Sequence, residues 1–489
     1  MIPRETLFDW LLLFALALLL GLSHGWAGVP DIDSKVYMTI ARNMLERGDW
    51  LVPFYHDKIF YLHPPLGIWL VAISFKIFGV SLYAARIPMV LSLFGIMLLI
   101  YAIALWMRGR RSALIAGVIF CLMYPIIQIA AKVHLDLPLT FFITLSIAGI
   151  YFAHQISDRW YLITGIGTGL AILTKGLVGL AIFPILGLTL LFTGRLKDIF
   201  SPFLWSAIAI SILIPYFWVV ALKDEGIRWV SAYWTAGVQG VANIDFEGIK
   251  RGYLYFPKIF LLYLLPWSVL AIWQVIKNIS TFSKNQDKSW LIFLFTILVF
   301  IVAFSIPNYK LPHYLLPAIP AVAILAAVGI SGILPIRMQE AFRALSVIII
   351  ALISFSLAIF PGPVRKSRSN DLIPLLPVIE TIHKERGVKE LAIIYLNPPH
   401  HMPYWERVAT FELYMPLSVE FIFKTTAAET MEYFKRPRYA LIEEGQLRDI
   451  SSLVPELKVL YKGEGLLLVS NTPLQLPPIH FKKVNYGRF

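Results

Sequence analysis

Apolar segments long enough to cross a lipid bilayer dominate this amino-acid sequence. A membrane-spanning helix needs about 20 mostly apolar residues. We place such segments near 6–26, 83–107, 112–131, 137–154, 160–174, 177–193, 202–221, 254–275, 289–306, 314–334 and 344–361. Hydrophobic residues make up 58% of the chain and charged residues only 15%, whereas soluble globular chains are about 25% charged. We therefore expect a polytopic α-helical membrane protein with about 11–13 transmembrane helices.

The charge of the chain argues against a nucleic-acid partner. The formal net charge is +13, but Lys and Arg are scattered through the connectors, and no basic run could follow a phosphate backbone. Anionic membrane lipid is the expected partner. The one cysteine, Cys121, lies inside an apolar segment, which excludes an intramolecular disulfide and a cysteine metal cluster.

The connectors between the apolar segments indicate an orientation. Short connectors rich in Arg and Lys, such as 108–111 and 337–343, favour the cytoplasmic side. The opposite side then holds the turn 131–136 and the longer loops 29–67 and 222–253. We expect a multi-pass protein of the cytoplasmic (inner) membrane, with the active site and the C-terminal region on the periplasmic or external side.

The two long loops are predicted to contain helices at the membrane surface. From Ser34 to Arg47, apolar residues recur at helical spacing, and Lys35, Arg42 and Arg47 fall on the polar side. Such an amphipathic helix would lie along the lipid headgroups. We expect a second interfacial helix in the 222–253 loop, and we also interpret the short apolar run 65–78 as interfacial.

After Pro361 the hydropathy falls and the pattern becomes that of a soluble domain. Helix-like runs alternate with strand-like runs, which indicates a small α/β domain. The helix-like runs are 371–386 and 427–434, and the strand-like runs are 391–396, 439–443, 457–461 and 466–470. The predicted domains are therefore a transmembrane domain, 1–361, and an external soluble domain, 362–489.

Two aspartates beside apolar segments are the first candidates for chemistry, because charge at membrane depth is costly. Asp33 stands just before the predicted helix in the first long loop, and Asp136 stands in a turn between two spanning segments. Each could instead cap the helix that follows it. Capping does not explain why Asp136 shares its turn with Lys132 and His134.

Several cations are expected on the same side as these aspartates. Lys175 and Lys310 interrupt apolar stretches, with Lys58, His63 and Arg251 behind them. Lysines in such places also snorkel to the interface without a function, and a lone histidine is more often structural. Two carboxylates facing several cations suit a site that deprotonates an alcohol or amine and receives a phosphate.

The chain resembles the GT-C class of membrane glycosyltransferases, in the branch that contains the aminoarabinose transferase of lipid A and the protein O-mannosyltransferases. The resemblance runs through the whole membrane part. It rests on DSKVYMTIARNM (33–44), GDWLVP (48–53), HPPLG (63–67), DLPLT (136–140), LTKG (173–176), LPW (265–267) and KLPHYLLP (310–317). The chain departs from the family pattern at Ser34 and Val36, where the family usually has an acidic residue and Arg. Leu62 and His63 stand where the aminoarabinose branch has Glu and Lys before the two prolines. The His-Pro-Pro form is closer to the mannosyltransferase branch.

The resemblance implies a GT-C fold and a catalytic centre formed by Asp33 and Asp136. The cations at the membrane surface, together with the lack of a recognisable soluble nucleotide-binding fold in the sequence, predict a sugar donor carried on a polyprenyl phosphate. Lys175 and Lys310 are the main candidate phosphate ligands, with Lys58, His63 and Arg251 as further ones.

Three further residues, Tyr37, His134 and His313, are expected to position the acceptor. That acceptor stays open between lipid A, another surface glycolipid or glycan, and a protein hydroxyl. A divalent metal ion is a candidate cofactor, with Asp136 and His63 as candidate ligands.

The expected mechanism follows from the leaving group. A phosphate departs without protonation, so the enzyme needs one base for the acceptor and positive charge for the phosphate. By its place in the family motif, Asp33 is the expected base, while Asp136 would orient the acceptor or hold a metal ion. This predicts an inverting single displacement. A membrane transporter or a flippase for lipid-linked sugar is the alternative, because intramembrane charge is also typical of transporters.

Overall fold

The structure is a computed structural model. It describes residues 4–22, 32–55, 58–235, 252–281, 287–307 and 310–359, and then 379, 382–383, 390–394, 396, 420–424, 426–436, 438–462 and 466–471.

The chain forms two compact units. The first comprises Met1–Trp26, Met44–Phe54 and Lys58–Pro361, and the second comprises Ala27–Asn43, Tyr55–Asp57 and Gly362–Phe489. Helix α2 (Ile32–Arg47) is therefore divided between the two units.

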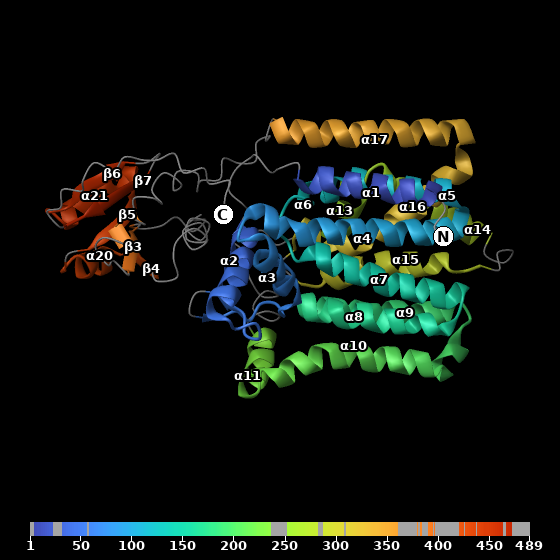
Figure 1. Cartoon of the computed structure of the whole chain (residues 1–489), viewed down its shortest axis with the longest axis horizontal. Helices are drawn as coiled ribbons and strands as arrows, with labels where there is room; N and C mark the ends of the chain where they lie inside the picture. The colour runs from blue at the N-terminus through green and yellow to red at the C-terminus, as the bar shows by residue number, and fades with distance from the viewer. Residues whose placement is uncertain are drawn as a thin grey trace. The chain divides into compact units, whose positions relative to one another are not determined.

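The first unit is a bundle of long apolar helices, among which α4, α7, α8 and α10 lie side by side (Figure 1). Within the described residues, seven helical segments are long and apolar enough to span a membrane, or eight if the bent pair α13 (Tyr255–Tyr263) and α14 (Trp267–Ser280) is one span. The seven are α1 (Arg4–Leu22), α4 (Leu82–Arg108), α7 (Asp136–Gln155), the run Asp158–Phe192, α10 (Pro202–Ala221), the run Pro312–Ile333 and α17 (Ile336–Ile359, within which Ile336–Ser356 meets the test). The protein is thus a polytopic membrane protein, as predicted.

The run Asp158–Phe192 consists of two helices that run in opposite directions, α8 (Tyr161–Lys175) and α9 (Ile182–Phe192). They are joined by the short 3-10 helix η2 (Gly176–Ala181). At one end, the Tyr161 hydroxyl donates to Asp198 at 2.8 Å, and His154 and Thr193 are bonded at 2.8 Å. The other end of α8 reaches Asp136, about 30 Å away along the 20 residues of α7. The chain therefore crosses twice here, as the separate segments 160–174 and 177–193 predicted.

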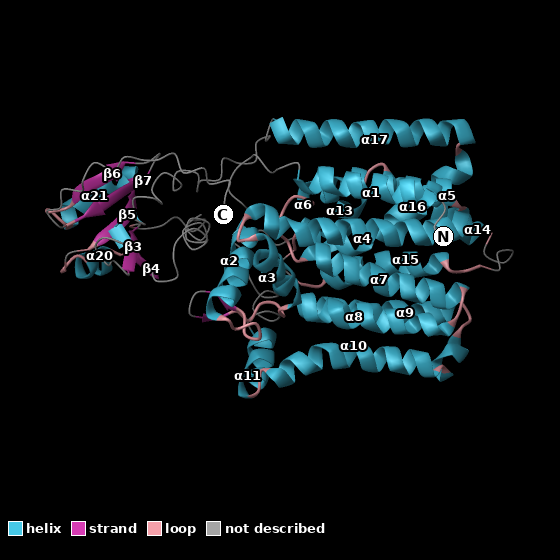
Figure 2. Cartoon of the chain, in the orientation of Figure 1, coloured by secondary structure: helices cyan, strands magenta, loops and turns pink. Residues whose placement is uncertain are grey.

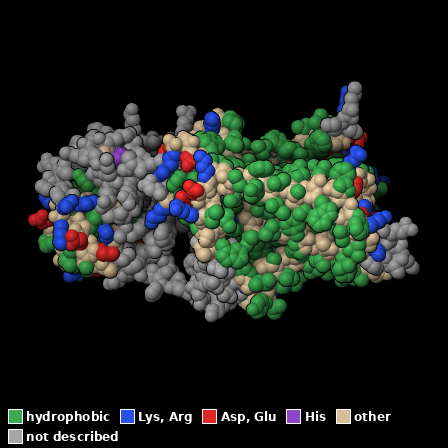
Figure 3. Space-filling model, turned by 90° about the horizontal axis from the view of Figure 1, so that it is seen from below, with side chains coloured by type: hydrophobic (Ala, Val, Ile, Leu, Met, Phe, Trp, Pro, Cys, Tyr) green, Lys and Arg blue, Asp and Glu red, His purple; other side chains and the backbone are tan. Residues whose placement is uncertain are grey.

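Hydrophobic side chains cover the visible face of this unit, and charged ones gather toward its ends (Figure 3). Helix α10 shows why, because only four of its 20 residues are buried while Trp205, Phe217 and other large apolar side chains are exposed. A helix that exposes apolar side chains in this way is suited to lipid, where they are not in contact with water.

Three predicted segments are interrupted or displaced. The predicted span 254–275 is interrupted, since α13 and α14 meet at a bend of 103°. Pro266 lies at that break and has no N–H to continue a helix. The segment 112–131 is divided into α5 (Arg110–Leu122) and α6 (Tyr124–Ile129). Helix α17 begins at Ile336, so Arg337 and Arg343 lie in a helix and not in a connector.

The remaining helices of this unit are shorter. Helix α3 (Leu66–Phe78) has 13 residues, about 20 Å, which is too short to cross and agrees with the interpretation of 65–78. Helix α15 (Trp290–Ser305), the 3-10 helix η5 (Pro312–Ala318) and α16 (Ile319–Ile333) follow the predicted segments closely. Helix α11 (Asp224–Ala232) lies in the 222–253 loop, where we expected a helix.

Helix α2 differs from the prediction in its start and its burial. It begins at Ile32, so Asp33 sits inside the first turn and does not cap it. Lys35 is fully buried, and Arg42 is 8% exposed. The prediction of a polar face is therefore wrong for Lys35 and Arg42, whereas the third cation, Arg47, is exposed as predicted. The pattern misled because long cationic side chains follow the same spacing whether they are solvated or buried.

The C-terminal part carries a five-stranded sheet of order β4-β3-β5-β7-β6 (Figure 2). Its strands are β3 (Glu390–Ile394), β4 (Glu420–Lys424), β5 (Tyr439–Glu443), β6 (Lys458–Lys462) and β7 (Leu466–Ser470). Strand β3 pairs parallel with β4 and β5, and β7 pairs antiparallel with β5 and β6.

Helices α20 (Ala427–Tyr433) and α21 (Leu447–Leu453) accompany this sheet. The α/β prediction is confirmed. Strand β4 and helix α21 were missed. The predicted helix 371–386 lies almost entirely outside the described residues.

Candidate active site

A buried ion pair forms the centre of the candidate site. Asp136 is the first residue of α7, and its carboxylate is 5% exposed; Lys175, the last residue of α8, places Nζ 2.7 Å from Asp136 Oδ1. No side chain caps α7, so Asp136 is not the helix cap that the alternative interpretation required. A buried carboxylate needs such a partner, because an uncompensated charge in the interior is strongly unfavourable.

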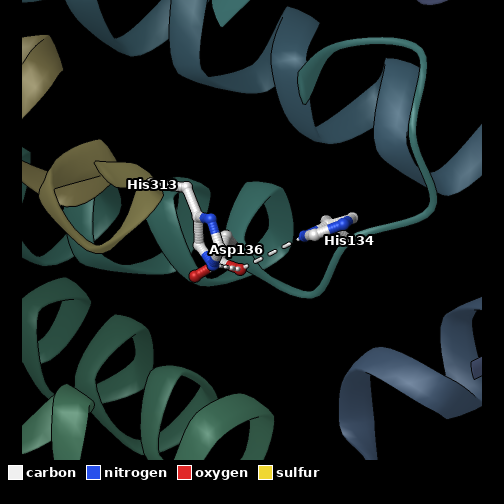
Figure 4. A group of neighbouring side chains, drawn as sticks. All are labelled: His134, Asp136 and His313. Carbon is white, nitrogen blue, oxygen red and sulfur yellow. Dashed lines mark ion pairs between the residues drawn. The ribbon is translucent and has the colours of Figure 1, made fainter. Parts of the chain in front are cut away.

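Two imidazoles face the other oxygen of the same carboxylate. His134 Nδ1 lies 3.7 Å from Asp136 Oδ2, and His313 Nε2 lies 4.0 Å from it (Figure 4). His134 comes from the turn before α7, whereas His313 comes from η5, more than a hundred residues away in sequence. Asp136 therefore uses its two oxygens differently, one for an ammonium group and one for the imidazoles.

These three side chains could hold a metal ion. One ligand atom from each of His134, Asp136 and His313 lies within 4.8 Å of the others. Of the two candidate metal ligands predicted, this group contains Asp136 but not His63.

His63 lies close enough to this cluster to be affected by its charges. Burial and then the positive charge of Lys175 lower the pKa of His63 from 6.5 to about 3, although the charge of Asp136 acts in the opposite direction. His63 is therefore neutral at physiological pH. As a phosphate ligand it would act as a hydrogen-bond donor and not as a cation.

The other predicted phosphate ligands differ in exposure. Lys310 is 4% exposed, its ammonium donates to the Pro307 carbonyl, and burial lowers its pKa. Lys58 is exposed in β2 (Lys58–Ile59), which pairs with β1 (Phe54–Tyr55). Arg251 lies outside the described residues.

The predicted base and one predicted acceptor residue lie on α2. Asp33 is half-buried, and Tyr37 is 7% exposed. Both belong to the residues 27–43 that group with the second unit. The site described here is therefore built from Asp136 and its neighbours in the first unit.

The turn after Lys175 is held by a residue that the sequence analysis did not identify. Gly176 has φ +61°, and the Leu177 N–H donates to the Tyr233 hydroxyl at 3.0 Å. Tyr233 stacks on Trp229 with 5.2 Å between ring centroids and 9° between planes. This contact fixes the backbone immediately after Lys175. The Lys-Gly pair was the only sequence signal for a sharp turn here.

Three tryptophans that the sequence analysis also missed hold the segment before His63. The indole N–H groups of Trp69, Trp218 and Trp229 donate to backbone carbonyls of the 50–60 segment at 2.5, 3.0 and 3.3 Å. Buried tryptophans usually find such an acceptor. Their positions near helix ends were the available signal, but their partners were not predictable.

An apolar pocket of about 450 Å³ adjoins this turn. Gly176 and Leu177, the two residues after Lys175, are part of its wall. The other lining residues are Pro64, Ile172, Leu180, Pro215, Trp218, Val219, Trp229, Val230, Ser231, Tyr233 and Trp234.

Comparisons with known proteins point to one family. The pattern of the dolichyl-phosphate-mannose-protein mannosyltransferase family matches residues 62–238. Two relatives are named undecaprenyl phosphate-alpha-4-amino-4-deoxy-L-arabinose arabinosyl transferase. The one from Photorhabdus laumondii is 29% identical over 60% of this chain and 54% of its own length. The one from Pectobacterium carotovorum is 29% identical over 68% of this chain and 60% of its own length. The chain thus spans little more than half the length of these relatives.

Solved structures show the same fold. ArnT from Cupriavidus metallidurans, bound to undecaprenyl phosphate, matches with a TM-score of 0.69 at 18% identity over 95% of this chain and 98% of its own. The Archaeoglobus fulgidus oligosaccharyltransferase in the apo form matches with a TM-score of 0.56 at 12% identity, over 92% of this chain and 71% of its own. With the motifs in order along the membrane unit, the chain has the fold of the GT-C membrane glycosyltransferases and is similar in sequence to the group that contains the aminoarabinose transferases and the protein mannosyltransferases.

Proposed function

We propose that this protein transfers a sugar from a polyprenyl-phosphate donor to an acceptor at the outer face of the cytoplasmic membrane. The observation that carries the proposal is the buried Asp136–Lys175 pair beside an apolar pocket. A polyprenyl-phosphate sugar combines a phosphate with a long apolar chain. The Lys175 ammonium could bind the phosphate of such a donor. The apolar pocket, whose wall includes the next two residues, Gly176 and Leu177, could hold part of its chain.

In this mechanism the site stabilises the departing phosphate. Asp136 holds the Lys175 ammonium in place before the reaction, so little reorganisation is needed as charge develops on the leaving oxygen. Lys310 is a second cation for the phosphate, and neutral His63 is a hydrogen-bond donor. Asp33 is the proposed general base: it removes the proton from the acceptor, whose oxygen or nitrogen attacks the anomeric carbon as the bond to phosphate breaks. One displacement of this kind inverts the anomeric centre.

The proposed orientation is supported by the distribution of charge along the bundle. Arg195 lies at the opposite end of α7 from Asp136, where its guanidinium donates to the His154 carbonyl at 2.9 Å. Basic residues in short connectors favour the cytoplasm, so the Asp136 end would face outward. The proposed domains are the catalytic transmembrane part, 1–361, and an external α/β part, 362–489.

Transfer by the purified protein in proteoliposomes tests this function. Undecaprenyl-phosphate carrying labelled 4-amino-4-deoxy-L-arabinose or mannose is the donor, and lipid A, a surface glycan or a peptide is offered as acceptor. Mass spectrometry of a new covalent product identifies the acceptor. Turnover of a nucleotide sugar without a lipid carrier would contradict the proposal, and movement of the donor across the bilayer without a new bond would indicate a flippase.

The base is tested by Asp33→Asn with Glu46→Gln as the matched control on the same helix. Loss of a general base costs about 100- to 10,000-fold in rate, so Asp33→Asn should nearly abolish turnover while donor binding persists. Glu46 is exposed, and its replacement should leave turnover nearly unchanged. If Asp33→Asn keeps turnover within about threefold of the parent, the base lies elsewhere.

A further inference from the structure

We propose that His134, Asp136 and His313 form a binding site for a divalent transition-metal ion of the Zn²⁺ type. His134 comes from the turn that leads into α7, Asp136 is the first residue of α7, and His313 lies in the 3-10 helix η5. The sequence analysis gave both histidines a different role, in positioning the acceptor. Their convergence on one oxygen of Asp136 is a property of the tertiary structure (Figure 4).

The carboxylate geometry leaves room for an ion despite the nearby lysine. Lys175 Nζ contacts Oδ1 at 2.7 Å, while the two imidazole nitrogens face Oδ2 at 3.7 and 4.0 Å. An ion could therefore bind Oδ2 while Lys175 stays on Oδ1. Zn²⁺ binds nitrogen and oxygen at about 2.0–2.2 Å, so tetrahedral ligands stand about 3.3 Å apart. The three ligand atoms lie within 4.8 Å of one another, so small side-chain rotations would have to bring them to that spacing.

The donor set selects the class of metal. Two imidazole nitrogens and one carboxylate oxygen suit Zn²⁺ and other first-row transition metals, whereas Mg²⁺ and Ca²⁺ prefer oxygen ligands alone. Burial favours the site as well, because Asp136 and His134 are each 4% exposed. Three protein ligands leave at least one coordination position open, as in catalytic zinc sites.

The charge of the loaded site fits the chemistry proposed above. Asp136 and Lys175 neutralise each other, so a bound dication leaves a net charge of about +2 beside the apolar pocket. That charge would attract the donor phosphate and stabilise it as it departs. This role rests on the proposed function, whereas binding of the ion does not.

Metal binding is measured on the full-length protein in detergent after treatment with a chelator. Zn²⁺ is titrated calorimetrically, and the metal content after dialysis is measured by mass spectrometry. We expect the parent to bind one equivalent more than the double variant His134→Ala/His313→Ala. The matched control is His154→Ala, since His154 lies at the far end of α7 and pairs with Thr193. It should bind as the parent does.

A second measurement covers the case in which the double variant does not fold. Co²⁺ added to the parent should give the visible absorption of a tetrahedral ion, and Asp136→Asn should lose it. Equal Zn²⁺ stoichiometry and affinity in the parent and a folded double variant, or no tetrahedral Co²⁺ spectrum in the parent, would overturn the inference. Sugar transfer by a parent that binds no metal would refute the metal site alone, whereas metal binding without any transfer would refute only the proposed function.

Discussion

Replacing Gly176 by alanine should destabilise the protein more than the same replacement at a glycine whose φ is also positive but whose surroundings have room for a Cβ. Gly176 has φ +61° and ψ −128°, a backbone conformation that costs a residue other than glycine about 1–3 kcal/mol. The added Cβ would also lie 1.9 Å from the Tyr233 hydroxyl, where ordinary contacts begin at 3.4 Å. The tyrosine ring must therefore move by about 1.5 Å in a close-packed region.

That movement removes two interactions. The hydrogen bond from the Leu177 N–H to Tyr233 is worth about 0.5–1.5 kcal/mol, and the stacking on Trp229 is worth a further 0.5–1.5 kcal/mol or so. Together with the backbone strain, Gly176→Ala should lower the free energy of unfolding by about 2–6 kcal/mol. Because Lys175 is the preceding residue, sugar transfer should fall as well.

Gly194 provides the matched control. It also has a positive φ, +75°, but nothing lies within 4 Å of a Cβ built there. Gly194→Ala should therefore cost only the backbone strain, about 1–3 kcal/mol. Unfolding in mixed micelles, followed by tryptophan fluorescence as SDS is added, compares the two variants. Equal losses for Gly176→Ala and Gly194→Ala would refute the argument, as would fully additive effects when Tyr233→Ala is combined with Gly176→Ala.

Three further predictions use the same unfolding assay. Lys175→Met leaves a buried carboxylate uncompensated and should cost about 3–5 kcal/mol, while adding Asp136→Asn should recover most of it; no recovery would mean that the pair is not coupled. His63 binds a proton near pH 3 when folded but near 6.5 when unfolded, so stability should fall as the pH drops below about 6.5; His63→Gln should show a shallower fall, and an unchanged slope would contradict the pKa. Arg110 makes two bonds of 2.6 and 2.7 Å to Asp9, which is 3% exposed and also accepts a 2.7 Å bond from Tyr101. Because the Arg110 side chain is 40% exposed, Arg110→Met should cost about 1–3 kcal/mol, and a loss below about 0.5 kcal/mol would show that Asp9 is solvated.

The class of protein and two residues of the site, Asp136 and Lys175, could be predicted from the sequence. Apolar segments of spanning length leave few alternatives, because a backbone in lipid must satisfy its own hydrogen bonds as helices. Asp136 and Lys175 could be identified because a charge at membrane depth is costly and therefore rarely without purpose. The family motifs then placed both in one centre, and the structure brings them to 2.7 Å.

The remaining features were decided by the tertiary structure. His313 reaches the second oxygen of Asp136 only because η5 packs against α7, and the position of Tyr233 under the Gly176 turn depends on α11. The burial of Lys35 was missed for the same reason, since local spacing is identical for a solvated and a buried cationic face. Periodicity reports which residues share a face of one helix. Contacts between side chains on different helices depend on packing between segments that are distant in the chain. The local sequence pattern does not predict that packing.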